Sequence, residues 1–171
     1  MSNHWHLLLW PYNDGELSAF MHWITMTHTQ RWHAFHQTVG TGHLYQGRFK
    51  SFPVQNSSHY LTALRYVESN PLRAGLVKSS SDWTWSSLAI RKGIAKDDLA
   101  ISTGPIALPM NWPGMVDLMP WESDLKKIER CIRHGMPLGQ DDWVEQTARD
   151  LGLTSSLRSR GRPRKSPEKG S

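Results

Sequence analysis

The chain has 171 residues, a length that allows one modest hydrophobic core with appendages and argues against two complete enzymatic domains. Lys and Arg (20) outnumber Asp and Glu (15), so the net charge of +5 and the pI of about 9.6 suit a polyanionic partner without proving one. The single cysteine, Cys131, excludes an internal disulfide and fits a reducing cytoplasm, and no apolar run is long enough for a membrane span or an export signal.

Residues 4–10 alternate in a way that predicts an extended strand. Residues two apart in a strand share a face, so His4 and His6 would present two imidazoles side by side. Two ring nitrogens on a rigid scaffold form half of a metal site.

Apolar residues at three- and four-residue spacing predict a long helix over residues 14–37, with Asn13 or Asp14 as its N-cap. His33 and His36 on this helix are close enough in sequence to share a metal. No carboxylate or cysteine accompanies them, so we assign these histidines no role.

Residues 44–55 are the second predicted strand, with a bulge at Gly47. Arg48 and Lys50 lie two residues apart and so share a face, where they would contact phosphate or simply face water. Of the nine tryptophans, we expect most to be buried anchors and one or two to be platforms for unstacked bases.

A third metal ligand and a nucleophile come from the next predicted helix, which Asn56 to Ser58 caps and Pro71 closes. Tyr66 and Asn70 are four residues apart and share one face of this helix. An amide oxygen is a competent ligand for a hard divalent cation, and a phenol one turn away can reach an electrophile held on that cation. Tyr60 is the rival nucleophile, but Leu64 rather than an amide follows it by four residues.

The remaining sequence predicts a short helix that Asp82 caps and that runs through Arg91, an irregular connector over residues 93–121, and two helices over residues 122–134 and 141–151. Two helices joined by a turn allow a helix-turn-helix interpretation, although any αα-hairpin has the same pattern. The basic end, residues 154–171, should be disordered. Its Arg160-Gly161-Arg162-Pro163 resembles the core of an AT-hook, and a solubilising charged tail is an equally good interpretation.

Several segments, in the order in which they occur, resemble the REP-associated tyrosine transposases of the HUH single-strand nuclease superfamily. His4-Trp5-His6 is similar to the His-hydrophobic-His motif, and Arg65 to Val77 is similar to the tyrosine helix. Residues 45–51 and 133–165 fit the same group. The resemblance implies an α+β fold, a ferredoxin-like antiparallel sheet with packed helices over residues 1–92, followed by the connector, a helical region over residues 122–153 and the tail. Family members carry a further strand and helix upstream, so we expect an N-terminally truncated and thinner sheet here.

The resemblance further implies a transposase and single-strand endonuclease that cleaves and rejoins hairpin-bearing, REP-like single-stranded DNA through a 5′-phosphotyrosine intermediate. Tyr66 would be the nucleophile, and His4, His6 and Asn70 would hold Mg²⁺ or Mn²⁺. We expect a monomer or homodimer associated with the bacterial nucleoid in the cytoplasm. The expected DNA contacts are basic: Arg48, Lys50, Arg73, Arg160, Arg162 and Arg164.

Two other interpretations stay open at the level of sequence. One is a non-catalytic DNA-binding remnant of such a transposase. The other is a zinc-bound domain built on the histidines, which needs a carboxylate or cysteine that the sequence does not place beside them.

Overall fold

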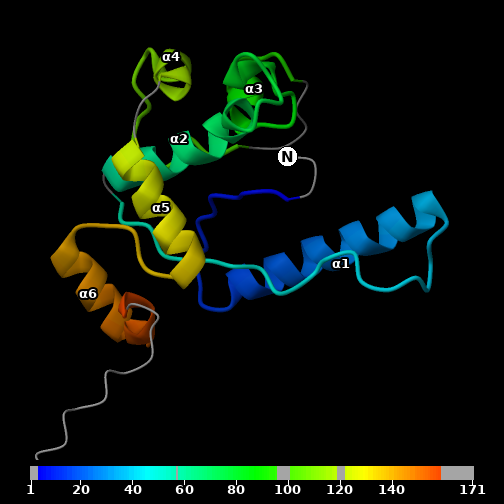
Figure 1. Cartoon of the computed structure of the whole chain (residues 1–171), viewed down its shortest axis with the longest axis horizontal. Helices are drawn as coiled ribbons and strands as arrows, with labels where there is room; N and C mark the ends of the chain where they lie inside the picture. The colour runs from blue at the N-terminus through cyan, green and yellow to red at the C-terminus, as the bar shows by residue number, and fades with distance from the viewer. Residues whose placement is uncertain (1–3, 57, 96–100, 119–121, 159–171) are drawn as a thin grey trace, which may run out of the picture.

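The described part of the chain is helical. The computed structural model describes residues 4–56, 58–95, 101–118 and 122–158 (Figure 1). Figure 1 shows the first helix extending away from the other helices. Within the described residues, no helix combines the length and apolar character that crossing a membrane requires. The α-helices are α1 (Glu16–His36), α2 (Ser58–Arg73), α3 (Ser87–Arg91), α4 (Trp112–Asp117), α5 (Glu122–His134) and α6 (Asp141–Asp150), and the 3₁₀ helices are η1 (Ser80–Asp82) and η2 (Thr154–Leu157).

The predicted ferredoxin-like antiparallel sheet is wrong, because the described residues form no sheet. Their only β-pairing is an isolated parallel bridge between Val54 and Leu138. An extended segment becomes a strand only when its backbone pairs with a neighbouring strand, and neither residues 4–10 nor residues 44–50 have that partner in the described chain. Only the middle of this segment alternates in burial, since His6 and Leu8 are half-buried while Leu7 is exposed, and both ends, His4 and Trp10, are exposed.

The bridge ties the end of the second predicted strand to the turn between α5 and α6. The Gln55 amide donates to the Leu138 carbonyl (2.8 Å), and the Leu138 amide donates to the Pro53 carbonyl (2.9 Å). The Gln140 amide donates to the Gln55 side chain in the same place (2.8 Å). These bonds hold the C-terminal helices against the first half of the chain.

The long first helix is confirmed, with a different start. Its N-cap is Gly15, and the carboxylate of Glu16 accepts hydrogen bonds from the backbone amides of Tyr12 and Asn13 and from the Asn13 side chain. The predicted capping by Asn13 or Asp14 is therefore wrong, since the acidic side chain reaches back to the chain before the helix.

The second helix is confirmed, but Pro71 does not close it. The helix continues to Arg73, and the Asn70 carbonyl accepts from the Ala74 amide (3.0 Å). A proline in the last turn removes one backbone donor while its own φ stays helical, so the helix can end a few residues later.

Downstream, α5 has the predicted bounds and α6 ends at Asp150. The short helix near residue 90 is capped by Ser86 rather than Asp82, since the Ser86 hydroxyl accepts from the Ala89 amide (3.1 Å). The connector, expected to be irregular, contains α4, whose Trp112 and Val116 are buried.

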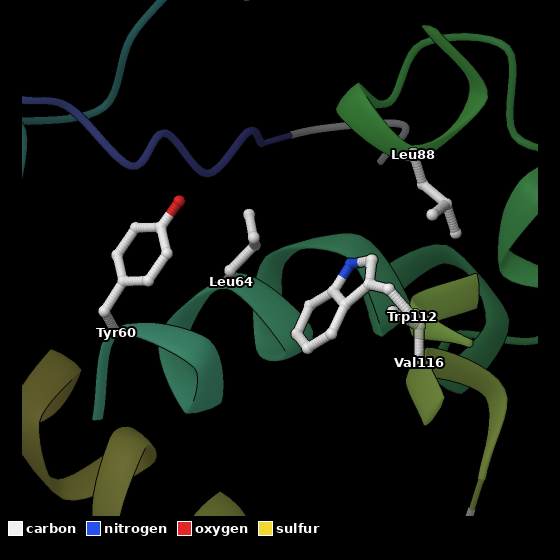
Figure 2. Packing of buried hydrophobic residues seen from close by; sticks show 5 residues of the cluster. All are labelled: Tyr60, Leu64, Leu88, Trp112 and Val116. Atoms are coloured by element: carbon white, nitrogen blue, oxygen red, sulfur yellow. The ribbon is translucent and has the colours of Figure 1, made fainter. Parts of the chain in front are cut away.

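Helix α2 packs on two sides. On one side Tyr60, Leu64 and Glu68, spaced by four residues, face α4 and the η1–α3 region, and Figure 2 shows the first two with the apolar residues that complete this cluster: Leu88, Trp112 and Val116. On the other side Ala63 and Tyr66 pack with Ile128 and Cys131 of α5. The N-terminal segment crosses α2, where Leu8 contacts both clusters.

Gly104 gives a test of this packing. Its φ is +78°, and a Cβ built there would lie 2.0 Å from the Tyr60 hydroxyl oxygen. Tyr60 is 7 % exposed and packs in the buried cluster, so the added methyl group must displace it. We therefore expect Gly104→Ala to lower the free energy of unfolding by roughly 1–3 kcal/mol beyond the cost of the left-handed backbone alone. Gly75→Ala is the matched control, because its φ is +68° and nothing lies within 4 Å of its Cβ position. Equal urea midpoints for the two variants would contradict the packing of Tyr60.

Candidate active site

A chain of ring contacts joins the N-terminal segment to α2. The ring centroids of His4 and His6 are 5.1 Å apart, edge to face. The His6 ring lies edge to face with the Tyr66 ring at 5.4 Å. The guanidinium carbon of Arg73 lies 4.8 Å from the centroid of the same tyrosine ring, within the usual cation–π range. Residues separated by about sixty positions in sequence therefore meet at one place.

Helix geometry explains why Tyr66, and not Tyr60, faces the histidines. Tyr60 is on the side of α2 that packs under α4, is 7 % exposed, and has a raised pKa because burial disfavours its charged form. Tyr66 is half-buried on the side facing His6. The structure therefore places Tyr66, and not Tyr60, beside His6.

Asn70 lies one turn after Tyr66 on α2 and is 8 % exposed. Its side-chain nitrogen is buried without a hydrogen-bond partner in the described chain. An unsatisfied buried amide is costly in a native protein, and a bound water or ion is one way to satisfy it. Because the oxygen and nitrogen of an amide are assigned by their hydrogen bonds, a cation would turn the oxygen toward itself.

The electrostatics of His6 suit metal ligation. Burial lowers its pKa from 6.5 to about 4, and the nearby His4 and Arg73 contribute in the same direction. The ring is therefore neutral at pH 7, which is the form that ligates a metal.

The spacing of the two imidazoles also suits a shared ion. With metal–nitrogen distances of about 2.1 Å, two imidazoles on one ion have their centroids roughly 4.5–5.5 Å apart at ordinary ligand angles. The observed 5.1 Å lies in this range. Among the described residues no group of three His, Cys, Asp or Glu side chains could hold a metal ion.

The expected DNA-contacting cations lie in different surroundings. Arg48 and Lys50 are exposed on the irregular segment after α1. Arg73 is in the last turn of α2, where Glu129 of α5 pairs with it at 3.8 Å. Arg160, Arg162 and Arg164 lie outside the described residues.

Sequence reasoning missed two carboxylates that organise this region. Glu68, between Tyr66 and Asn70, is fully buried and binds side chains from α3 and α4. Glu129 brings α5 to Arg73. Glu68 continues the four-residue spacing of Tyr60 and Leu64, and that spacing was the available signal for its burial.

Two imidazoles, a phenol and a guanidinium meet beside α2, and with the Asn70 amide one turn after the phenol on the same helix they form a candidate site for phosphoryl chemistry. Residues 1–70 match the family model described as IS200-like transposase. The match includes His4, His6 and Tyr66 and ends at Asn70. It supports a transposase family for this segment and a transposase-like DNA-processing function. No curated protein and no solved structure matches the chain.

Proposed function

We propose that the chain is a metal-dependent REP-associated tyrosine transposase that cleaves and rejoins hairpin-bearing single-stranded DNA. The observation that carries the proposal is the contact of His6 with both His4 and Tyr66, at 5.1 and 5.4 Å between ring centroids. The family match over residues 1–70 supports the same function, because it includes these three residues.

In this proposal Tyr66 attacks the scissile phosphorus. A bond forms between the phenolic oxygen and phosphorus, the bond from phosphorus to the 3′ oxygen breaks, and the phenol's proton reaches the departing 3′ hydroxyl through solvent. The downstream strand stays on Tyr66 as a 5′-phosphotyrosine. Attack by another 3′ hydroxyl reverses these steps, restores a phosphodiester and frees the tyrosine.

The other residues have distinct parts in the proposal. His4, His6 and Asn70 would hold Mg²⁺ or Mn²⁺, which supplies positive charge to the non-bridging phosphate oxygens. Arg73 places a fixed positive charge beside the Tyr66 ring. Arg48 and Lys50 contribute phosphate contacts from the exposed segment after α1.

Labelling each end of the DNA in turn tests the chemistry. We expect a denaturant-resistant protein band with a 3′-labelled hairpin strand and Mn²⁺, and a free shortened fragment with the 5′-labelled strand, because the tyrosine retains the downstream piece. EDTA should abolish both products. A band with the 5′ label only, or an undiminished band in EDTA, would contradict the proposal.

The alternative, a non-catalytic DNA-binding remnant, is favoured by one observation. The histidines lie on a segment that is not paired into a sheet in the described chain. This alternative gives no covalent band with either label, while its affinity for DNA falls as salt rises and phosphate contacts are lost.

A further inference from the structure

A series of aromatic rings runs from the N-terminal segment onto α1. Trp5, between His4 and His6 in the chain, contacts Tyr45 with ring centroids 6.2 Å apart. Tyr45 contacts His28 of α1 at 5.7 Å, and its hydroxyl oxygen lies 2.6 Å from Nδ1 of that histidine. The series then follows α1 through three more rings, and we call the whole set the aromatic track: Trp5, Tyr45, His28, Trp32, His36 and Phe35.

The helical part of the track lies along one side of α1. His28, Trp32 and His36 are spaced by four residues, which spans about 12 Å of helix. The ring centroids of Trp32 and His36 are 3.9 Å apart with only 24° between the ring planes, so the two rings are stacked. An unpaired base could continue this stack. Figure 1 shows that α1 projects from the other helices and that the chain following it runs back alongside, where Tyr45 contacts His28.

The track is a surface feature and not a core. Met21 is the one buried residue of α1, whereas Trp32 is 41 % exposed and Phe35 is 83 % exposed. Connected exposed aromatic rings are unusual on a monomeric protein and mark a binding surface.

The charged residues near the aromatic track indicate which kind of partner it would bind. The sequence contains no Asp or Glu from Leu17 to Val67, a stretch that includes every ring of the track except Trp5. The same stretch carries Arg31, Arg48 and Lys50, all exposed. Aromatic rings with interspersed cations and no carboxylates are the pattern of proteins that stack unpaired bases while neutralising phosphates.

We propose that the aromatic track binds unpaired bases of single-stranded DNA and leads the strand to the candidate active site. The inference deepens the proposed function and rests on it in one respect, since the strand bound here is the one that Tyr66 would attack. Base stacking on rings tolerates any sequence, so the track contributes affinity and direction, not recognition of a particular sequence.

A binding experiment in EDTA separates the track from the chemistry. We expect fluorescence anisotropy with a labelled oligothymidine of about a dozen nucleotides to show affinity lowered roughly tenfold by Trp32→Ala. Trp23→Ala is the matched control, because Trp23 is an exposed tryptophan of α1 nine residues from Trp32 and so on the opposite side of the helix. Its affinity should stay within about twofold of wild type.

An abasic strand of equal length tests the stacking itself. Wild type should bind it about as weakly as Trp32→Ala binds oligothymidine. Equal wild-type affinity for the two strands, or equal losses in Trp32→Ala and Trp23→Ala, would overturn the proposal. So would a Trp32→Ala variant that keeps its affinity but loses self-association by sedimentation, since the face would then bind a second copy.

The two proposals fail in different ways. Loss of binding in Trp32→Ala, without any covalent band from wild type in Mn²⁺, supports the track and removes the transposase chemistry. A Tyr66-dependent band in Mn²⁺ with unchanged binding in Trp32→Ala does the reverse.

Discussion

Tyr66→Phe is expected to lower formation of the covalent protein–DNA band by about a thousandfold or more, because loss of a nucleophile removes the bond-forming group and leaves only binding. The variant keeps the ring that contacts His6 and Arg73, so packing around the site should not change. The measurement is the fraction of 3′-labelled hairpin strand that stays with the protein in denaturant, with Mn²⁺ present.

Tyr60→Phe is the control for this result. Tyr60 belongs to the same helix, but its ring is buried in the cluster with Leu64 and Trp112. We expect its covalent band to stay within about threefold of wild type, because the change removes only a hydroxyl. If Tyr66→Phe kept the band and Tyr60→Phe lost it, our choice of nucleophile would be wrong.

Glu68→Ala should have the largest effect on stability. The carboxylate is fully buried, accepts from the Ser87 hydroxyl (2.5 Å) and the Trp112 indole (2.7 Å), and pairs with Arg91 at 3.6 Å. Removing it leaves the Ser87 hydroxyl, the Trp112 indole and the Arg91 guanidinium without this partner and creates a cavity. We therefore expect the free energy of unfolding to fall by about 3–5 kcal/mol. Urea unfolding followed by tryptophan fluorescence measures the change.

Two further variants make this result specific. Glu68→Gln keeps the volume and one acceptor for the Trp112 indole, so its loss should be smaller, at about 1–3 kcal/mol. Glu145→Ala removes an exposed carboxylate of α6 that pairs only with Arg149 four residues away, and its urea midpoint should hardly move. A Glu68→Ala midpoint close to that of Glu145→Ala would show that the buried network is not what anchors α2.

The helices could be predicted from the sequence because their signals are local. The three- and four-residue spacing around Ile24 and Ile128 indicated α1 and α5 directly. Strands depend on a partner elsewhere in the chain, so the alternation over residues 4–10 predicted a strand that the described chain does not form. Trp112 stands among prolines and glycines without periodic neighbours, and therefore its place in the core had no sequence signal.

The candidate site shows the same division. A pair of histidines and a tyrosine four residues before an asparagine are motifs, and the structure brings the histidines and the tyrosine together. Arg73 lies over the tyrosine ring from two turns further along α2 and also pairs with Glu129 of α5, whereas sequence alone suggested only a phosphate contact. The absence of Asp and Glu from Leu17 to Val67 was visible in the sequence. Only the ring contacts of α1 showed that this stretch contains a connected set of exposed aromatic side chains.

The double-sided burial of α2 bears on how this protein can be dissected. Trp112 and Val116 cover one side of the helix and Ile128 and Cys131 the other, and all four follow Lys92. A fragment that stops at Lys92 would retain the histidines and the tyrosine yet leave their supporting helix bare to water on two sides. The piece that matches a family and the piece that can be prepared in a folded form are therefore of different lengths.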